Sequence, residues 1–380
     1  MNLDSSIVNP HATNIASETT AAGGKVSAQK LSHLLALDGV RGVAALMVMI
    51  FHYWQGKGFD RLGIPAGISK VAVFGQTGVD LFFVLSGFLI TRILISSREQ
   101  PCYFRNFYGR RVLRILPLYY LFLVIYFFVL PVIENSPVEP FGKTWWYWFY
   151  LQNFPDTFTH LSAAGPLHYW SLAVEEHFYM FWPLLVYLAP VRALTWWSVA
   201  VIGLTIAVRA LFVFGLSIGV FYFTLCRMDA LAFGALLACL EASGRLQSCR
   251  KITVFILAVL LPPLIFAWTR LTGSGADFLQ VIKFSFIGLV YFAILGLVVL
   301  YKDSIWIGSL LGNRFLRWVG KISYGLYVYH GLCYYLVDKG AFLAPALNLL
   351  FSFALAFLVS YLSFRFFEMP FLRLKRFFQD

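Results

Sequence analysis

The sequence predicts an all-α polytopic membrane protein with about ten transmembrane helices. Of its 380 residues, 60% are hydrophobic and only 13% are charged, and the mean hydropathy is +0.74, which is typical of a chain that lies mostly within a bilayer. Apolar stretches long enough to cross a membrane recur through most of the sequence. The basic residues cluster in alternate connecting segments, as the positive-inside rule requires.

The first 33 residues differ in composition from the rest. Residues 1–33 are rich in Ser, Thr, Ala and Asn and contain no apolar core that could act as a signal peptide, so we expect a disordered cytoplasmic tail. The net charge of +12 is explained by basic cytoplasmic loops and does not indicate nucleic-acid binding. The five cysteines are scattered without metal-ligand spacing, so we expect neither a disulfide framework nor a metal site.

Ten segments are predicted to cross the membrane. They cover residues 34–54, 71–95, 115–133, 170–189, 196–216, 227–243, 252–268, 279–300, 322–337 and 344–366. The aromatic piece Trp145–Leu151 is only about half as long as a span. If it stays on one side, every basic segment faces the cytoplasm, whereas a crossing would invert all later spans. We therefore expect a re-entrant or interfacial segment within residues 140–169 that caps a cavity, with both termini cytoplasmic, including the basic segment 371–380.

Two ionisable residues, Arg41 and His52, lie inside the first predicted span. Eleven helical steps of about 100° return to within about 20° of the starting direction and climb roughly 16 Å, so both groups share one helix face. An arginine in mid-helix costs at least about 2.5–3.5 kcal/mol on insertion scales, and such a residue indicates a functional site. The alternative is that Arg41 reaches back to one interface while His52 lies at the other.

An arginine cluster follows the second predicted span. Arg110, Arg111 and Arg114 lie in an amphipathic stretch on the predicted cytoplasmic side. Arginine forks match phosphate oxygens in bidentate fashion, so the cluster suits a multiply phosphorylated ligand. The alternative is simple anchoring to anionic membrane lipid.

Two adjacent carboxylates lie in the fourth predicted span. Glu175 and Glu176 are one to two turns into it, and Tyr179 shares a face with Glu175. By the predicted topology they lie at the depth of His52, where a carboxylate would orient the imidazole and stabilise the imidazolium. The alternative is a structural ion pair with Arg227 or Arg209.

Other polar groups within spans are Asp80, Arg209, Arg227, Asp229 and His330. For Asp80 and Arg209 we favour mutual or backbone satisfaction over chemistry. Arg227 and Asp229 are predicted at the outer end of their helix, near the depth of His52, and His330 lies in mid-span. Together with Tyr179, these last three residues are candidate substrate contacts.

Seven motifs together resemble one known family. They are LDGVRGVAALMVMIFHY from Leu37, GVDLFFVLSGFLIT from Gly78, FYGRRVLRILP from Phe107, WSLAVEEHFY from Trp170, RMDALAFGALLA from Arg227, KISYGLYVYH from Lys321 and FEMPF from Phe367. On these motifs the chain is similar to the membrane-bound acyltransferase-3 family, which O-acetylates bacterial surface glycans. The resemblance assigns residues 34–370 to the family's transmembrane domain.

The resemblance implies an O-acyltransferase in the bacterial inner membrane, with acetyl-CoA or another acyl-CoA as cytoplasmic co-substrate. It implies acyl transfer at His52 with support from Arg41 and Glu175, and CoA phosphate contacts for the arginine cluster. His177 stands where glutamine is usual. The expected acceptor is a glycan hydroxyl, and direct transfer is favoured over an acyl-histidine intermediate.

Two alternatives remain at this stage. The same fold acylates small lipophilic acceptors, such as a macrolide or a lipid, in some family members. In a different class, a glycan or solute transporter also carries charges within its spans. A transporter more often has paired halves with corresponding broken helices, and the sequence shows none.

Overall fold

The computed structural model describes residues 35–57, 72–158, 161, 163–257, 259, 261, 277–302, 304–340 and 344–378. Within these residues every regular element is helical and no strand occurs, so the predicted all-α class is confirmed. The predicted tail, residues 1–33, lies outside the described residues, and so does much of the predicted span 252–268.

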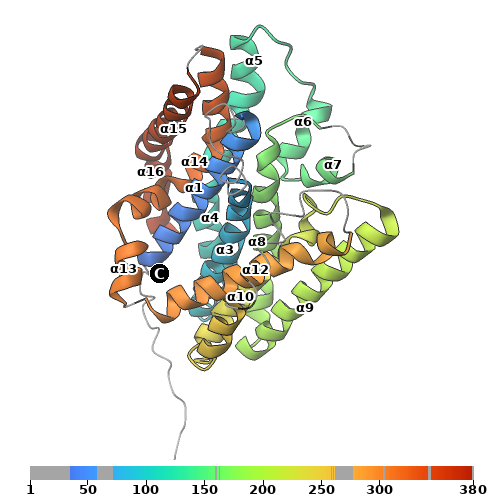
Figure 1. Ribbon diagram of the computed structural model, residues 1–380, viewed down its shortest axis with the longest axis vertical. Coiled ribbons are helices and arrows are strands. Elements are labelled where there is room, and N and C mark those ends of the chain that lie inside the picture. Colours follow the sequence, from blue (N-terminus) through green and yellow to red (C-terminus); the bar gives the residue numbers. More distant parts are fainter. Residues whose placement is uncertain are drawn as a thin grey trace, which may run out of the picture. The chain divides into compact units, whose positions relative to one another are not determined.

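The helices follow one another along the chain as Figure 1 shows. They are α1 (Leu35–Lys57), η2 (Gly75–Thr77), α3 (Gly78–Ser96), α4 (Tyr103–Val124), η3 (Ile125–Val129), α5 (Leu130–Ile133), α6 (Phe141–Trp148), α7 (Asn153–Thr157), η4 (Leu167–Tyr169), α8 (Trp170–Leu188), α9 (Val191–Ala210), η5 (Leu211–Leu216), η6 (Thr224–Cys226), α10 (Met228–Ala242), α12 (Asp277–Leu300), α13 (Ile305–Leu310), α14 (Arg314–Gly340), α15 (Pro345–Leu362), η7 (Ser363–Glu368), α16 (Met369–Arg373) and η8 (Leu374–Phe378).

Six helical segments among the described residues are long and apolar enough to cross a membrane, as a multi-pass membrane protein requires. They are Leu35–Gly56, Ala72–Ser96, Tyr103–Ile133, Val191–Leu216, Asp277–Leu300 and Pro345–Phe378. Each overlaps one predicted span. Three further predicted spans are helices that are shorter or more polar, namely α8, α10 and α14. The number ten therefore stays a prediction.

Two predicted boundaries need correction. The helix that contains the third predicted span begins at Tyr103, well before residue 115, so the arginine cluster is part of the helix. The helix that contains the ninth predicted span begins at Arg314, before residue 322. In both cases polar residues extend an apolar helix, because backbone hydrogen bonding continues past the end of the hydrophobic stretch.

Helices α1 and α14 pack closely and run in the same direction. A Cβ atom on Gly42 would lie 2.3 Å from the Leu316 carbonyl oxygen, and one on Gly320 would lie 1.9 Å from the Asp38 oxygen. Only glycine permits such a backbone approach. Ten residues further along each helix, His52 meets His330. The glycine crossing therefore sets the register that brings the two histidines together.

Helices α3 and α10 form a second parallel pair. A Cβ atom on Gly87 would lie 1.9 Å from the Leu231 oxygen, and one on Gly234 would lie 2.0 Å from the Val84 oxygen. Seven residues earlier on each chain segment, Asp80 pairs with Arg227. Close backbone packing and a buried ion pair thus fix the same register.

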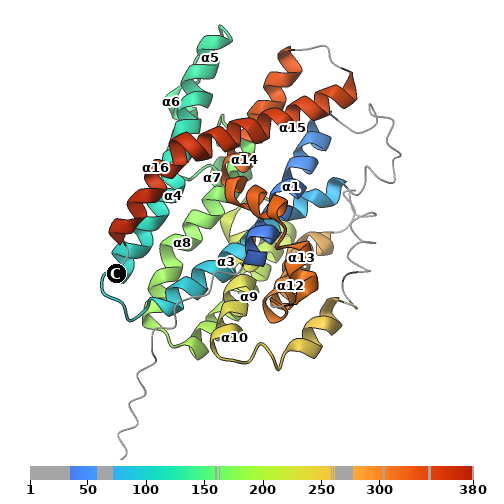
Figure 2. The same cartoon turned by 90° about the vertical axis from the view of Figure 1, so that its left-hand side faces the viewer.

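The aromatic segment and the C-terminal helices both pack on α4. The hydroxyls of Tyr119 and Tyr120 donate to the carbonyl oxygens of Tyr147 and Trp148, at 2.7 and 3.0 Å. The predicted aromatic piece is a short helix, α6, that ends at Trp148. Figure 2 shows α16 running alongside α4, with the C-terminus near the start of α4.

Candidate active site

Three cavities adjoin one another between the helices. The first, here called the basic cavity, is lined by Arg41, Arg110, Arg111, Arg114 and Lys375. Among the described residues that line it, none is acidic. Five cations around one cavity repel one another unless an anion enters. The arginine cluster predicted from sequence therefore forms a concave site and not only a helix surface, and Lys375 is an addition that the sequence did not indicate.

The second cavity, here called the middle cavity, shares Arg41, Arg111 and Arg114 with the basic cavity. Its lining also includes Glu175 and Glu176. The first two cavities therefore adjoin at these arginine side chains, which are long and flexible.

The third cavity, here called the histidine cavity, has a volume of about 560 Å³ and is lined by His52, His168 and His330. It shares Val79 and Tyr327 with the middle cavity. The Tyr327 hydroxyl donates to the carbonyl oxygen of His168 at 2.6 Å and also contacts the Ser171 hydroxyl. Tyr327 therefore stands in the wall between the two cavities.

His52 and His330 form a hydrogen-bonded pair. The His330 Nε2 and His52 Nδ1 atoms are 2.9 Å apart, and the rings stack with centroids 4.9 Å apart. On its other side, His330 Nδ1 lies 3.0 Å from the Leu326 carbonyl oxygen. A carbonyl oxygen only accepts, so Nδ1 of His330 donates and its Nε2 accepts from His52. Neutral His52 is thereby left with its Nε2 lone pair free to accept a proton.

His168 is a third imidazole that the sequence reasoning did not single out. Its ring centroid lies 5.1 Å from that of His330 and 6.2 Å from that of His52. Its ring donates to the Val328 carbonyl, and its Nε2 atom has no hydrogen-bond partner in the described part of the chain. The only sequence signal was its place two residues before WSLAVEEHFY.

The predicted contact between Glu175 and His52 is corrected by the structure. Glu175 lies within hydrogen-bonding reach of Ser86 and Tyr179 and interacts with the charges of Arg41 and Arg111. It lines the middle cavity, whereas His52 lines the histidine cavity. The shared depth of two residues on different helices does not place them together, since depth leaves their positions within the membrane plane undetermined.

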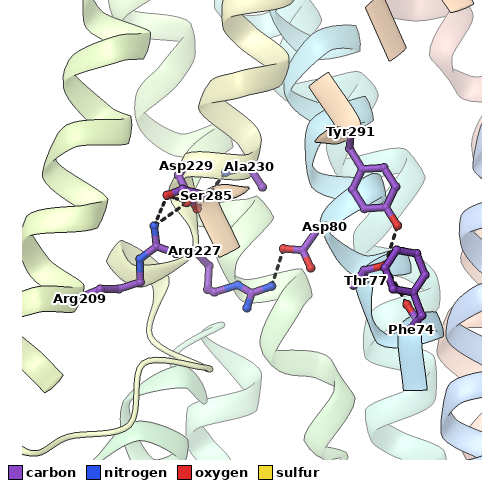
Figure 3. Close-up of polar contacts among 9 residues, drawn as sticks. All are labelled: Phe74, Thr77, Asp80, Arg209, Arg227, Asp229, Ala230, Ser285 and Tyr291. Carbon is purple, nitrogen blue, oxygen red and sulfur yellow. Dashed lines mark hydrogen bonds and ion pairs between the residues drawn. The ribbon is translucent and has the colours of Figure 1, made fainter. Parts of the chain in front are cut away.

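Arg227 and Asp229 lie in a buried ion-pair network (Figure 3). Arg227 binds Asp80 at 2.7 Å, and Asp229 binds Arg209 at 2.7 Å and accepts from Ser285 at 2.6 Å. Asp80 and Arg209 are each paired with a residue at the start of α10 and not with each other.

Arg227 is also enclosed by aromatic rings. Its guanidinium lies 3.8 Å from the centre of the Phe284 ring and 5.2 Å from those of Trp170 and Phe221. Trp170 and Phe221 line the histidine cavity, and the described cavities include neither Arg227 nor Asp229. Arg227 thus supports the cavity wall, and the contact of Arg227 and Asp229 with substrate stays a prediction.

Tyr179 and His177 face a lateral apolar groove between α4 and α8. Tyr179 is buried beneath the Arg111 guanidinium, which lies 4.4 Å from its ring centre, so its role here is to position Arg111. His177 Nδ1 lies 2.8 Å from the Thr224 hydroxyl, and its ring donates to the Tyr150 carbonyl. His177 therefore ties the aromatic segment to α8, and glutamine also has the donor and acceptor groups for such contacts.

The fold and the site define a multi-pass membrane protein with a cationic cavity near the start of α1 and a partly buried histidine pair near its end. Residues 34–365 match the family model described as the acyltransferase domain, so the chain belongs to the acyltransferase-3 family. No solved structure matches the chain significantly.

Three curated relatives illustrate the similarity. A putative peptidoglycan O-acetyltransferase of Bacillus subtilis is 31% identical over 77% of this chain and 47% of its own length. The peptidoglycan O-acetyltransferase of Listeria monocytogenes is 29% identical over 88% of this chain and 55% of its own. A putative O-acetyltransferase of Staphylococcus aureus is 26% identical over 90% and 58%. The chain spans about half the length of these relatives.

Proposed function

We propose that this acyltransferase domain moves an acetyl group from cytoplasmic acetyl-CoA to a hydroxyl of a glycan on the far side of the membrane. The observation that carries the proposal is the series of three cavities. Arg41, near the start of α1, lines the basic and middle cavities, and His52, near its end, lines the histidine cavity. The two residues are roughly 16 Å apart along the helix axis, a distance suited to an extended thioester arm.

The residues of each cavity suit one part of the donor. The cations of the basic cavity match the phosphate groups of CoA. The middle cavity would receive the arm, and the thioester would reach the histidine cavity beside Tyr327. Aromatic side chains with a few polar groups line the histidine cavity, as is usual for sites that bind organic ligands.

In the chemical step, His52 Nε2 removes the proton from the acceptor hydroxyl, and the hydroxyl oxygen attacks the thioester carbonyl. A C–O bond forms, the C–S bond breaks, and the CoA thiolate then takes up a proton. The imidazolium of His52 keeps its Nδ1 proton directed at His330 Nε2, which stabilises the new charge. An acyl-histidine intermediate is the alternative route to the same products.

The names of the relatives indicate the class of acceptor. Two of them are named as peptidoglycan O-acetyltransferases, one putatively, and we infer that this chain likewise modifies a glycan hydroxyl. This assignment takes precedence over the small lipophilic acceptors and over the transporter, since the family match runs across residues 34–365.

We also infer ten spans with both termini cytoplasmic in the bacterial inner membrane. The parallel directions of α3 and α10 require an odd number of crossings between them, and α4, α8 and α9 supply three. A further crossing by α6, which has only eight residues, would reverse α10. The packing thus favours an aromatic segment that does not cross.

The test uses purified protein in detergent with acetyl-CoA and a soluble glycan oligomer. We expect free CoA and an O-acetylated product in equal amounts by thiol assay and mass spectrometry. His52→Ala should lower turnover by about 10²- to 10⁴-fold. His177→Gln, a histidine outside the histidine cavity, is the matched control and should retain most activity. Wild-type turnover in His52→Ala, or no CoA release by the wild type, would reject the proposal.

A further inference from the structure

We propose that the C-terminal turn η8 completes the donor site and that Lys375 is a phosphate ligand. This inference rests on the proposed function, because it names a further part of the acyl-CoA site. Lys375 lines the basic cavity together with arginines from α1 and α4, although it lies more than 260 residues further along the chain. The site is therefore assembled from the two ends of the domain.

The charges in the basic cavity are only partly neutralised. Arg41 contacts Asp38 at 3.4 Å, and Arg114 interacts electrostatically with Glu368. The Arg111 guanidinium stacks over the Tyr179 ring and interacts electrostatically with Glu175 and Glu176, which lie outside the basic cavity. Arg110 keeps a buried Nε atom without a hydrogen-bond partner in the described part of the chain. An excess of cations with an unsatisfied buried donor indicates an anionic ligand with several phosphate groups.

The sequence of α4 fits the docking of η8. A Cβ atom on Gly109 would lie 2.2 Å from the Phe378 ring, and the Arg105 guanidinium lies 5.6 Å from the centre of the same ring. Gly109 thus leaves the space that Phe378 fills. Docking of Phe378 on α4 holds η8 in place, and this carries Lys375 to the cavity.

The neighbouring residue provides a contrast on the same turn. The Arg376 guanidinium lies 5.0 Å from the Phe377 ring centre, and Arg376 does not line the basic cavity. General attraction between a basic C-terminus and an anion would involve both residues about equally. A built site would depend on Lys375 far more than on Arg376.

The experiment measures CoA binding to the full chain in detergent by calorimetry, so it needs no turnover. We expect Lys375→Ala to raise Kd by about ten-fold, as for loss of a hydrogen bond to a charged group, and Arg376→Ala to change it less than two-fold. Lys375→Met, which keeps the apolar stem, should weaken binding like the alanine variant and guards against a fold defect. Thermal unfolding of every variant should match the wild type.

A second variant tests the docking itself. Gly109→Ala should displace Phe378 and weaken CoA binding to a similar extent, and adding it to Lys375→Ala should give little further loss. Gly203→Ala is the control, since a Cβ atom there meets nothing within 4 Å. Unchanged CoA affinity in Lys375→Ala, or an equal loss of affinity in Lys375→Ala and Arg376→Ala, would overturn this inference but not the proposed donor. A wild type that does not bind CoA would overturn the proposed donor as well.

Discussion

The direction of each hydrogen bond in the histidine pair determines where a proton can move. His330 donates to the Leu326 carbonyl and accepts from His52, so the helix backbone of α14 sets the tautomers of both rings. His52 can then act as a base at its Nε2 atom. Removal of His330 should therefore affect the chemistry of His52 more than the binding of either substrate.

We predict that His330→Ala lowers kcat by roughly ten- to hundred-fold, because a hydrogen bond to a charged group contributes about 1.5–3 kcal/mol. His330→Gln should recover part of the loss, since its amide oxygen can accept from His52 Nδ1. The measurement is steady-state transfer over a range of pH, and the base-limb pKa of kcat should shift in the alanine variant. An unshifted profile with a raised KM alone would show that His330 serves only packing or binding.

The two carboxylates of α8 have different surroundings. Glu175 lines the middle cavity and reaches Ser86 and Tyr179, whereas Glu176 also faces the lateral groove. Successive residues on a helix point about 100° apart, so Glu175 and Glu176 cannot both point directly at Arg41 and Arg111.

We predict that Glu175→Gln reduces turnover more than Glu176→Gln, because Glu175 lies among Arg41, Arg111 and Tyr179 and its loss leaves two cations less well balanced. The predicted role changes accordingly from orienting His52 to arranging the donor path. The measurement is transfer at matched folded protein, with KM for acetyl-CoA determined separately. A larger loss in the Glu176 variant would contradict this assignment.

At the scale of helices, the α1–α14 crossing places the pair of histidines. Gly42 and Gly320 allow backbone contact, and both histidines lie ten residues beyond it. A small separation of the two helices would lengthen the 2.9 Å contact between the imidazoles and weaken it steeply.

We predict that Gly320→Ala destabilises the fold by about 1–3 kcal/mol, because its Cβ atom would overlap the Asp38 carbonyl, and that kcat falls further than the loss of folded protein explains. Gly340→Ala on the same helix has nothing within 4 Å and serves as the control. Thermal unfolding and transfer are measured on the same samples. Equal effects of the two variants would show that the crossing does not control the site.

At the scale of the whole domain, the cavities are ordered along the helices. The start of α1, the start of α4 and the C-terminal turn surround the basic cavity, whereas the later part of α1 and the turn before α8 surround the histidine cavity. In the proposed arrangement, in which the start of α1 is cytoplasmic and acyl-CoA is the donor, the charged part of the donor never has to leave that side. Only its arm enters the apolar interior, which avoids the cost of burying phosphate charges.

We predict that, in intact cells, a membrane-impermeant thiol reagent labels a cysteine introduced at Ser136, between α5 and α6, but does not label one introduced at Lys302 or Arg376. The native cysteines are first replaced, since Cys102 is exposed. Lysed cells provide the control, in which all three positions should react. External labelling at Lys302 or Arg376 would refute cytoplasmic positions for these segments and with them the ten-span arrangement.

Much of the fold could be predicted from sequence, because hydrophobic length is a local property. The all-α class is confirmed among the described residues, and six predicted spans coincide with helices that are long and apolar enough to cross a membrane. Helix ends such as Tyr103 and Arg314 could not be predicted from hydropathy, since polar residues continue those helices. The count of ten and the sides of the termini remain predictions.

The sequence by itself determined which residues carry charge inside the membrane and which share a helix face, since both follow from composition and from the helical period. It could not determine which helix lies against which. Only the tertiary structure paired His52 with His330, Asp80 with Arg227 and Arg209 with Asp229, and brought Lys375 to the arginine cluster. For His52 with His330 and for Asp80 with Arg227, the partners are distant in the chain, and close packing at glycines, which hydropathy does not encode, sets their register.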